Sequence, residues 1–156
     1  MGLDMYLTKK TYIGEEYAHR KITGIIDIKE NEKPLNIQFN RVSEISERVG
    51  YWRKANQIHK WFVDNVQDGE DDCKEYEVSE EQLKQLLADC KAVLANKDKA
   101  PELMATERGF FFGGIDYDEY YFQEIEETIV IVEAALSERT EDGKYLQGDY
   151  CYRASW

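Results

Sequence analysis

Residues 43–66 carry the hydrophobic pattern that most constrains how this chain can fold. Seven positions recur at alternating spacings of four and three, which places them on one face of an α-helix: Ile45, Val49, Trp52, Asn56, His59, Val63 and Val66. Ala55 and Phe62 widen this face. We therefore predict one long helix over residues 43–66, with Ser43 or Ser46 as its N-cap.

Two polar residues, Asn56 and His59, interrupt the apolar face of this predicted helix one turn apart. One interpretation makes them core residues, each hydrogen-bonded to a buried neighbour. The other makes them a ligand site, with positive charge from Arg53 and Lys60 and a flat stacking surface from Trp52. That combination suits a small planar anion such as a nucleotide or cyclic nucleotide. Both interpretations stay open from the sequence.

The rest of the chain carries strand patterns at both ends. Alternating apolar residues predict strands over 3–13 and 35–39, a β-rich segment predicts one over 22–28, and a C-terminal strand is expected within 145–156. Residues 14–21, which include His19, are polar and predict a loop.

Two further helices follow from their N-terminal signals. Ser79 and Gln82 form a capping box before an apolar stripe that runs to Leu94. Asp116 and Glu119 form a second box, and the helix after it extends to about residue 138. The expected fold is α+β, an antiparallel sheet of three N-terminal strands and one C-terminal strand with three helices packed on one face. The length of the chain indicates a single domain over residues 1–156.

Two aromatic clusters are candidates for closing a ligand site. Residues 110–112 are three phenylalanines between glycines, which predicts either a short buried strand or the wall of a pocket or interface. Tyr117, Tyr120 and Tyr121 fit the edge of a core or a ligand platform. If Asn56 and His59 bind a ligand, we expect Tyr6, Phe112, Tyr120 or Tyr121 to close the site.

Charge is distributed unevenly along the chain, whose net charge is −12. Residues 1–60 carry 11 Lys and Arg against 8 Asp and Glu, whereas residues 61–156 carry 9 against 24. An acidic protein repels nucleic-acid backbones, so generic nucleic-acid binding is not expected. The sequence has no apolar run that could span a bilayer and no signal-peptide pattern, so we expect a cytoplasmic protein without membrane contact.

Known catalytic and metal-binding patterns are missing from the sequence. The three cysteines, Cys73, Cys90 and Cys151, form no close pair, and the acidic residues 68–72 fit a solvated turn better than a calcium loop. Phosphate-loop, dinucleotide, serine-elbow and metalloprotease motifs do not occur. We assign no catalytic residue, no metal ligand and no cofactor.

Four segments resemble a family of small uncharacterised proteins from bacteriophages and prophages. They are MGLDMYL at 1–7, YWRKANQIHKWFV at 51–63, GFFFG at 109–113 and YDEYY at 117–121. The resemblance implies a phage accessory protein working in the cytoplasm of a bacterial host. Small accessory proteins of phages often counter host defence, some by sequestering nucleotide immune signals.

Three functional hypotheses follow. The first is a protein that binds and sequesters a small anionic, nucleotide-like ligand at Trp52, Arg53, Asn56, His59 and Lys60. The second is an acidic inhibitor that binds a host protein by imitating DNA. The third is a small enzyme of unknown type. The sequence leaves a homo-oligomer open.

Overall fold

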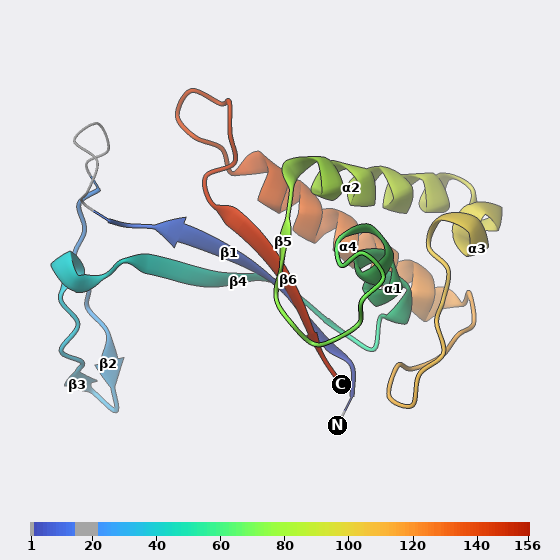
Figure 1. The fold of residues 1–156 in the computed structure, drawn as a ribbon, viewed down its shortest axis with the longest axis horizontal. Helices are drawn as coiled ribbons and strands as arrows, with labels where there is room; N and C mark the ends of the chain where they lie inside the picture. Colours follow the sequence, from blue (N-terminus) through green and yellow to red (C-terminus); the bar gives the residue numbers. More distant parts are fainter. Residues whose placement is uncertain (1, 15–21) are drawn as a thin grey trace.

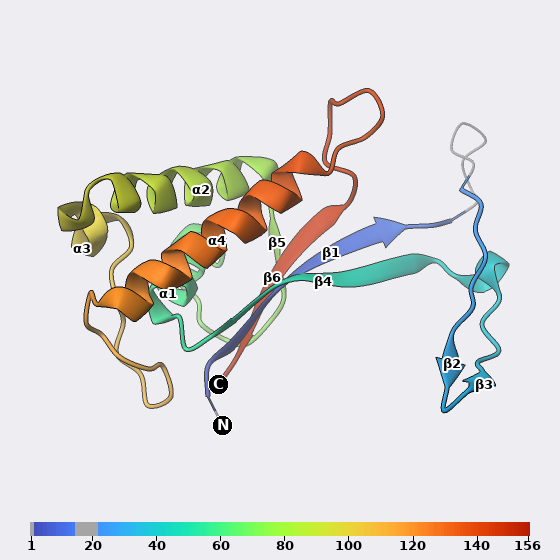
Figure 2. The ribbon, with the colours of Figure 1, turned by 180° about the vertical axis from the view of Figure 1, so that it is seen from behind.

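The computed structural model describes residues 2–14 and 22–156 and confirms the α+β class. A four-stranded antiparallel sheet has the order β4-β1-β6-β5, and the helices α1, α2 and α4 lie together on one side of it (Figures 1 and 2). The loop predicted over 14–21 lies almost entirely outside the described residues. No helix within the described ranges is long and apolar enough to cross a membrane.

The central strand β1 (Asp4–Tyr12) confirms the first predicted strand. It pairs on one side with β4 (Glu44–Arg53) and on the other with β6 (Asp149–Ser155), which confirms the C-terminal strand. The short β5 (Tyr76–Val78) forms the other edge of the sheet. Leu3, Met5 and Leu7 are fully buried beneath the helices, so the alternate residues of β1 face the opposite side of the sheet.

The long helix predicted over 43–66 is wrong in its first half. Residues 44–53 form β4, and the helix α1 covers only Asn56–Asn65. The error has a structural cause, because the register between β1 and β4 shifts between Leu7 and Thr8 and leaves an extra residue in β4. This bulge puts Ile45 and Trp52, seven positions apart, on the same face of the strand. Residues seven positions apart face opposite sides of a regular strand but the same side of an α-helix. The bulge therefore gives this strand a hydrophobic spacing that is typical of a helix.

The strands predicted over 22–28 and 35–39 are also wrong. This region instead contains the two-residue strands β2 (Lys29–Glu30) and β3 (Lys33–Pro34) and the 3₁₀ turn η1 (Phe39–Arg41). Together with the distal ends of β1 and β4, these residues form an arm that projects away from the body of the protein (Figure 1). Apolar side chains in it are exposed, Ile25 at 96%. Those at 35–39 alternate in sequence, but the core formed by the described residues includes none of residues 22–41.

The second and third predicted helices are confirmed as α2 (Glu80–Ala95) and α4 (Glu119–Ser137). The capping box of α2 forms as expected, with the Gln82 amide donating to Ser79 Oγ at 3.1 Å and the Ser79 amide to Gln82 Oε1 at 2.9 Å. The cap of α4 is Asp118, not Asp116, since Asp118 Oδ1 accepts a hydrogen bond from the Tyr121 amide.

Two short elements lie between these helices, the 3₁₀ turn η2 (Lys97–Lys99) and the helix α3 (Ala100–Leu103). Residues 109–114 form no strand, and Phe110 is 94% exposed.

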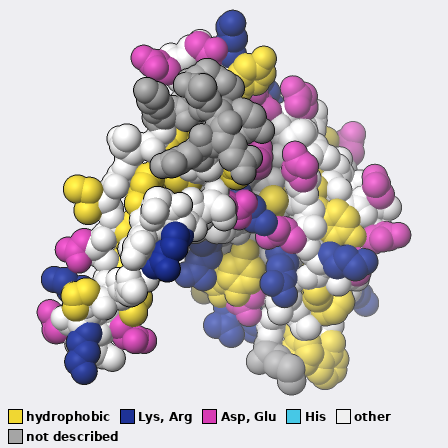
Figure 3. Space-filling model, turned by 60° about the vertical axis from the view of Figure 1, so that its left-hand side comes forward, with side chains coloured by type: hydrophobic (Ala, Val, Ile, Leu, Met, Phe, Trp, Pro, Cys, Tyr) yellow, Lys and Arg dark blue, Asp and Glu magenta, His cyan; other side chains and the backbone are white. Residues whose placement is uncertain are grey.

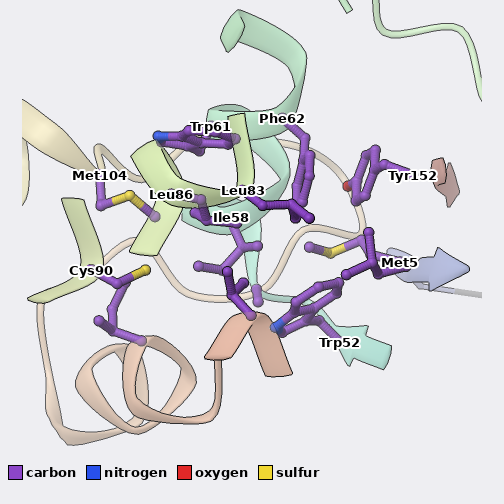
Figure 4. Close-up of a cluster of buried hydrophobic side chains, with 14 of the residues drawn as sticks. Met5, Trp52, Ile58, Trp61, Phe62, Leu83, Leu86, Cys90, Met104 and Tyr152 are labelled. Carbon is purple, nitrogen blue, oxygen red and sulfur yellow. The ribbon is translucent and has the colours of Figure 1, made fainter. Parts of the chain in front are cut away.

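The core lies between the sheet and the helices, with α1 at its centre (Figure 4). Ile58 and Phe62 of α1 are fully buried against Leu83 and Leu86 of α2 and the sheet. The ring of Phe62 stacks on that of Tyr152 in β6, with ring centroids 3.8 Å apart. Burial of aromatic and aliphatic side chains from all layers makes this contact region the main source of stability.

Candidate functional site

A hollow of about 310 Å³ opens where β4 passes into α1, against the loop that leads to α4. We call it the corner hollow. Its lining combines two cations, three carboxylates, two tyrosines, a glutamine and two glycines: Arg53, Lys54, Asp116, Asp118, Glu124, Tyr120, Tyr121, Gln57, Gly113 and Gly114.

A close backbone approach shapes one wall of the corner hollow. Lys54 leaves β4 with a φ of +63°, and its amide donates to the carbonyl of Leu3 at 2.8 Å. Gly113 has a φ of +89°, and a Cβ at this position would lie 3.0 Å from both the Cβ and the carbonyl oxygen of Lys54. Glycine therefore meets two requirements at position 113, a left-handed backbone and space for the neighbouring chain.

Asn56 fixes the loop that forms this wall. Its Nδ2 donates to the carbonyls of Phe112 at 3.0 Å and Gly114 at 2.7 Å, and its Oδ1 accepts from the Glu107 amide at 2.9 Å. The side chain is only 1% exposed. Both donors and the acceptor of the carboxamide are thus used by the protein, and Asn56 supports the corner hollow from behind.

The charges of the corner hollow are of both signs. Arg53 Nε lies 3.8 Å from Asp4 Oδ1, a loose and mostly exposed pair, and Lys54 forms no ion pair with any described residue. Opposite them, Glu124 is half-buried, and this burial raises the pKa of its carboxyl, although Gln57 Nε2 donates to it at 2.7 Å. The site can therefore pair with an anionic group and also accept hydrogen bonds from hydroxyls or amines.

Three of the nine residues predicted as a ligand site line the corner hollow: Arg53, Tyr120 and Tyr121. Tyr120 is 76% exposed and offers a free ring face, whereas Tyr121 is buried and donates its hydroxyl to the carbonyl of Met104 at 2.7 Å. Burial also raises the pKa of Tyr121. Arg53 and Tyr120 are thus the predicted residues with groups available to a ligand here.

The other predicted residues lie elsewhere. Trp52 is buried and donates from Nε1 to Thr128 Oγ1 at 2.9 Å, and Lys60 pairs with Asp64 at 2.8 Å. Tyr6 lies on the side of the sheet away from the helices.

His59 does not line the corner hollow; it is fully buried and belongs to a separate group of hydrogen-bonded side chains. Its Nδ1 lies 2.8 Å from Tyr152 Oη, and its Nε2 lies 3.1 Å from Asp71 Oδ2. Phe112 contacts the same ring edge-on, with centroids 5.3 Å apart, and Trp156 Nε1 also donates to Asp71 Oδ2. A neutral imidazole protonated on Nε2 satisfies this arrangement by donating to the carboxylate and accepting from the phenol. His59 therefore ties α1 to β6 and to the acidic turn.

The sequence did not single out Lys54, Gln57 and Glu124 as site residues, nor the pair Gly113 and Gly114. The available signal was the double glycine directly before an acidic helix start, a pattern that marks a turn where backbone segments approach closely. The charge of Lys54, with those of Arg53 and Lys60, permits a local anion site, but the predicted continuous helix hid the corner at which Lys54 and Gln57 lie.

Comparison of the chain with protein-family models, with curated proteins and with solved structures found no match. Within the described part of the chain, no group of three or more His, Cys, Asp or Glu side chains is arranged to hold a metal ion.

Proposed function

We propose that this protein binds a small, nucleotide-like anion in the corner hollow. The observation that carries the proposal is the combination of Arg53 and Lys54 with carboxylates and the exposed ring of Tyr120 around one hollow. Its volume of about 310 Å³ is at the small end of the range for ligand pockets. The ligand is thus a single nucleotide or a compact cyclic one.

Each group has a role in this proposal. Arg53 and Lys54 pair with phosphate oxygens, Arg53 through its planar guanidinium and Lys54 as a point charge. Tyr120 stacks on the base. Asp116 and Glu124 accept hydrogen bonds from ribose hydroxyls or an exocyclic amine. A binder of this kind, together with the resemblance to phage accessory proteins, supports sequestration of a nucleotide signal as the biological role.

Titration calorimetry with a panel of linear and cyclic nucleotides tests the proposal. Lys54→Met removes a cation from the corner hollow, and Lys60→Met is its matched control, because Lys60 pairs with Asp64 instead. We expect Lys54→Met to weaken binding roughly ten- to a hundredfold, the effect of losing a charged hydrogen bond, and Lys60→Met to leave it unchanged. Binding should also weaken as salt is added. Absence of binding by the parent protein, or equal loss in both variants, would contradict the proposal.

The acidic inhibitor remains a second candidate because of a broader hollow along the start of α4. It measures about 790 Å³, and three carboxylates outnumber one cation in its lining, which consists of Asp118, Glu119, Glu126, Lys97, Gln123, Tyr117 and Phe122. Native mass spectrometry of protein purified from infected cells separates the two candidates. A retained compound of nucleotide mass supports the first candidate, and a retained host protein that is lost in Glu119→Lys supports the second.

A further inference from the structure

The sheet has one face that no described helix covers (Figures 1 and 2). The strand register places arginine and tyrosine side chains on this face. Because Met5 and Leu7 face the helices, Tyr6 and its cross-strand neighbours face the other way. The register places Tyr51 and Arg153 on either side of Tyr6. We call each such set of cross-strand neighbours a row. The rows on either side of Tyr6 are those of Thr8, which has Arg48 beside it, and of Asp4, which has Arg53 beside it.

We call the five residues Tyr6, Tyr51, Arg48, Arg53 and Arg153 the tyrosine–arginine patch. Its two rings lie 5.4 Å apart between centroids, tilted by 38°, and the Arg48 guanidinium lies 5.8 Å from the centroid of each. The three arginines and Tyr51 are exposed, and Tyr6 is half-exposed. Figure 3 shows Lys and Arg side chains beside hydrophobic ones, with Asp and Glu side chains among them, in the region between the arm and the body.

Local charge at this patch is opposite to that of the whole protein. Asp4 and Glu77 of β5 are the carboxylates within the three rows. Asp4 accepts a hydrogen bond from the Tyr51 hydroxyl and lies 3.8 Å from Arg53, and Glu77 lies opposite Cys151 at the edge of the Thr8 row. Three guanidinium groups against two carboxylates leave a local excess of positive charge on a chain of net charge −12. Guanidinium groups bind phosphate in a fork geometry, and tyrosine rings stack on bases of any sequence.

We infer that the tyrosine–arginine patch binds a short single-stranded nucleic acid, stacking about two bases on Tyr6 and Tyr51 while the arginines pair with the phosphates between and beside them. The net negative charge repels the rest of a long strand and any duplex, which limits binding to a short segment and to low salt. This patch is a site beyond the nucleotide hollow, with which it shares only Arg53.

Fluorescence anisotropy with dye-labelled ten-nucleotide oligonucleotides, one of RNA and one of DNA, tests the inference at low salt. We expect the parent protein to bind with an affinity that falls on adding salt, with a slope of about −2 in the logarithmic plot for three neutralised phosphates. Tyr6→Ala should weaken binding about tenfold or more, and Tyr6→Phe should retain it, because stacking needs the ring and not the hydroxyl.

Arg48→Glu is the decisive variant, and Lys144→Glu is its control. Both change the net charge by the same amount, but Lys144 lies in an exposed loop outside the patch. Loss of binding in Arg48→Glu alone, with the circular dichroism spectrum unchanged, supports the patch. Equal loss in both variants, equal displacement by base-free polyphosphate, or no binding by the parent overturns it. Neither Tyr6 nor Arg48 lines the corner hollow, so failure here leaves nucleotide binding by the corner hollow as a separate result.

Discussion

The imidazole of His59 and the phenol of Tyr152 form a 2.8 Å hydrogen bond inside the core, between residues 93 positions apart. Both side chains are fully buried, and burial raises the pKa of Tyr152 well above its usual value. The other ring nitrogen of His59 contacts Asp71 at 3.1 Å. One imidazole thus connects the helix at the centre of the core with the returning strand and with the acidic turn.

Replacing His59 with alanine should destabilise the protein, because it leaves the hydroxyl of Tyr152 without its buried partner and opens a cavity. We expect a loss of about 1–3 kcal/mol in the free energy of unfolding from the hydrogen bonds alone, measured by urea denaturation. Lys60→Ala, one position further along α1 and partly exposed, should cost less than 1 kcal/mol. Equal stability of His59→Ala and the parent would show that the imidazole is not a structural connection.

Asn56→Asp should destabilise the protein strongly, although the two side chains are of similar size. A carboxylate accepts hydrogen bonds but cannot donate them, so the carbonyls of Phe112 and Gly114 would face a negative charge in place of an N–H group. We expect a loss of about 2–3 kcal/mol in the free energy of unfolding at neutral pH. Partial recovery of stability at acidic pH, where the carboxyl gains a proton, is the signature that separates this cause from a simple packing defect.

The neighbouring glycines give a matched pair of substitutions. Gly113→Ala places a methyl group 3.0 Å from Lys54 on a backbone with φ of +89°, which should cost about 1–3 kcal/mol. Gly114→Ala meets nothing within 4 Å and should leave the melting temperature nearly unchanged. A similar melting temperature for the two alanine variants would show that the backbone contact with Lys54 does not constrain the loop.

Glu124→Gln should raise stability at neutral pH. Burial raises the pKa of this carboxyl in the folded protein, so the folded state carries a penalty for the charged form that the unfolded chain does not. This penalty is absent below the unfolded pKa of about 4.3, grows as the pH rises through the raised folded value and then persists. Denaturation at several pH values should therefore show a gain at pH 7 that disappears near pH 4. Glu126→Gln, exposed on the same helix, should show no such gain.

The elements that the sequence predicted correctly are those decided by local contacts or by a regular period. The capping box of Ser79 and Gln82 needs only three residues of chain, and β1 alternates without interruption. Residues 44–53 depended instead on pairing with β1, and the bulge gave them a helical period. Residues 22–28 are β-rich and residues 35–39 alternate as strands do, but the sequence cannot show that the core of the described residues includes neither segment.

The positions of the predicted ligand residues also depended on contacts between distant parts of the chain. Trp52 and Asn56 were placed on one helical face, but they lie on β4 and α1, on either side of a sharp corner at Lys54. Arg53 was included because of its charge, and it does line the corner hollow, with a loop from more than fifty residues further along the chain. Such long-range proximity follows from the fold and not from spacing, so only the residue types could be predicted.

The position of β1 at the centre of the sheet also sets the order in which a newly synthesised chain can fold. Met5 pairs with Trp52 on one side and with Ala154 on the other, and 149 positions separate Met5 from Ala154. At ordinary rates of translation, roughly ten to thirty seconds pass between the synthesis of these two partners. During this time β1 and β4 can form a hairpin while the other edge of β1 has no partner. The arm is therefore the part that the growing chain can complete first, and the core under Leu3, Met5 and Leu7 closes only when β6 arrives.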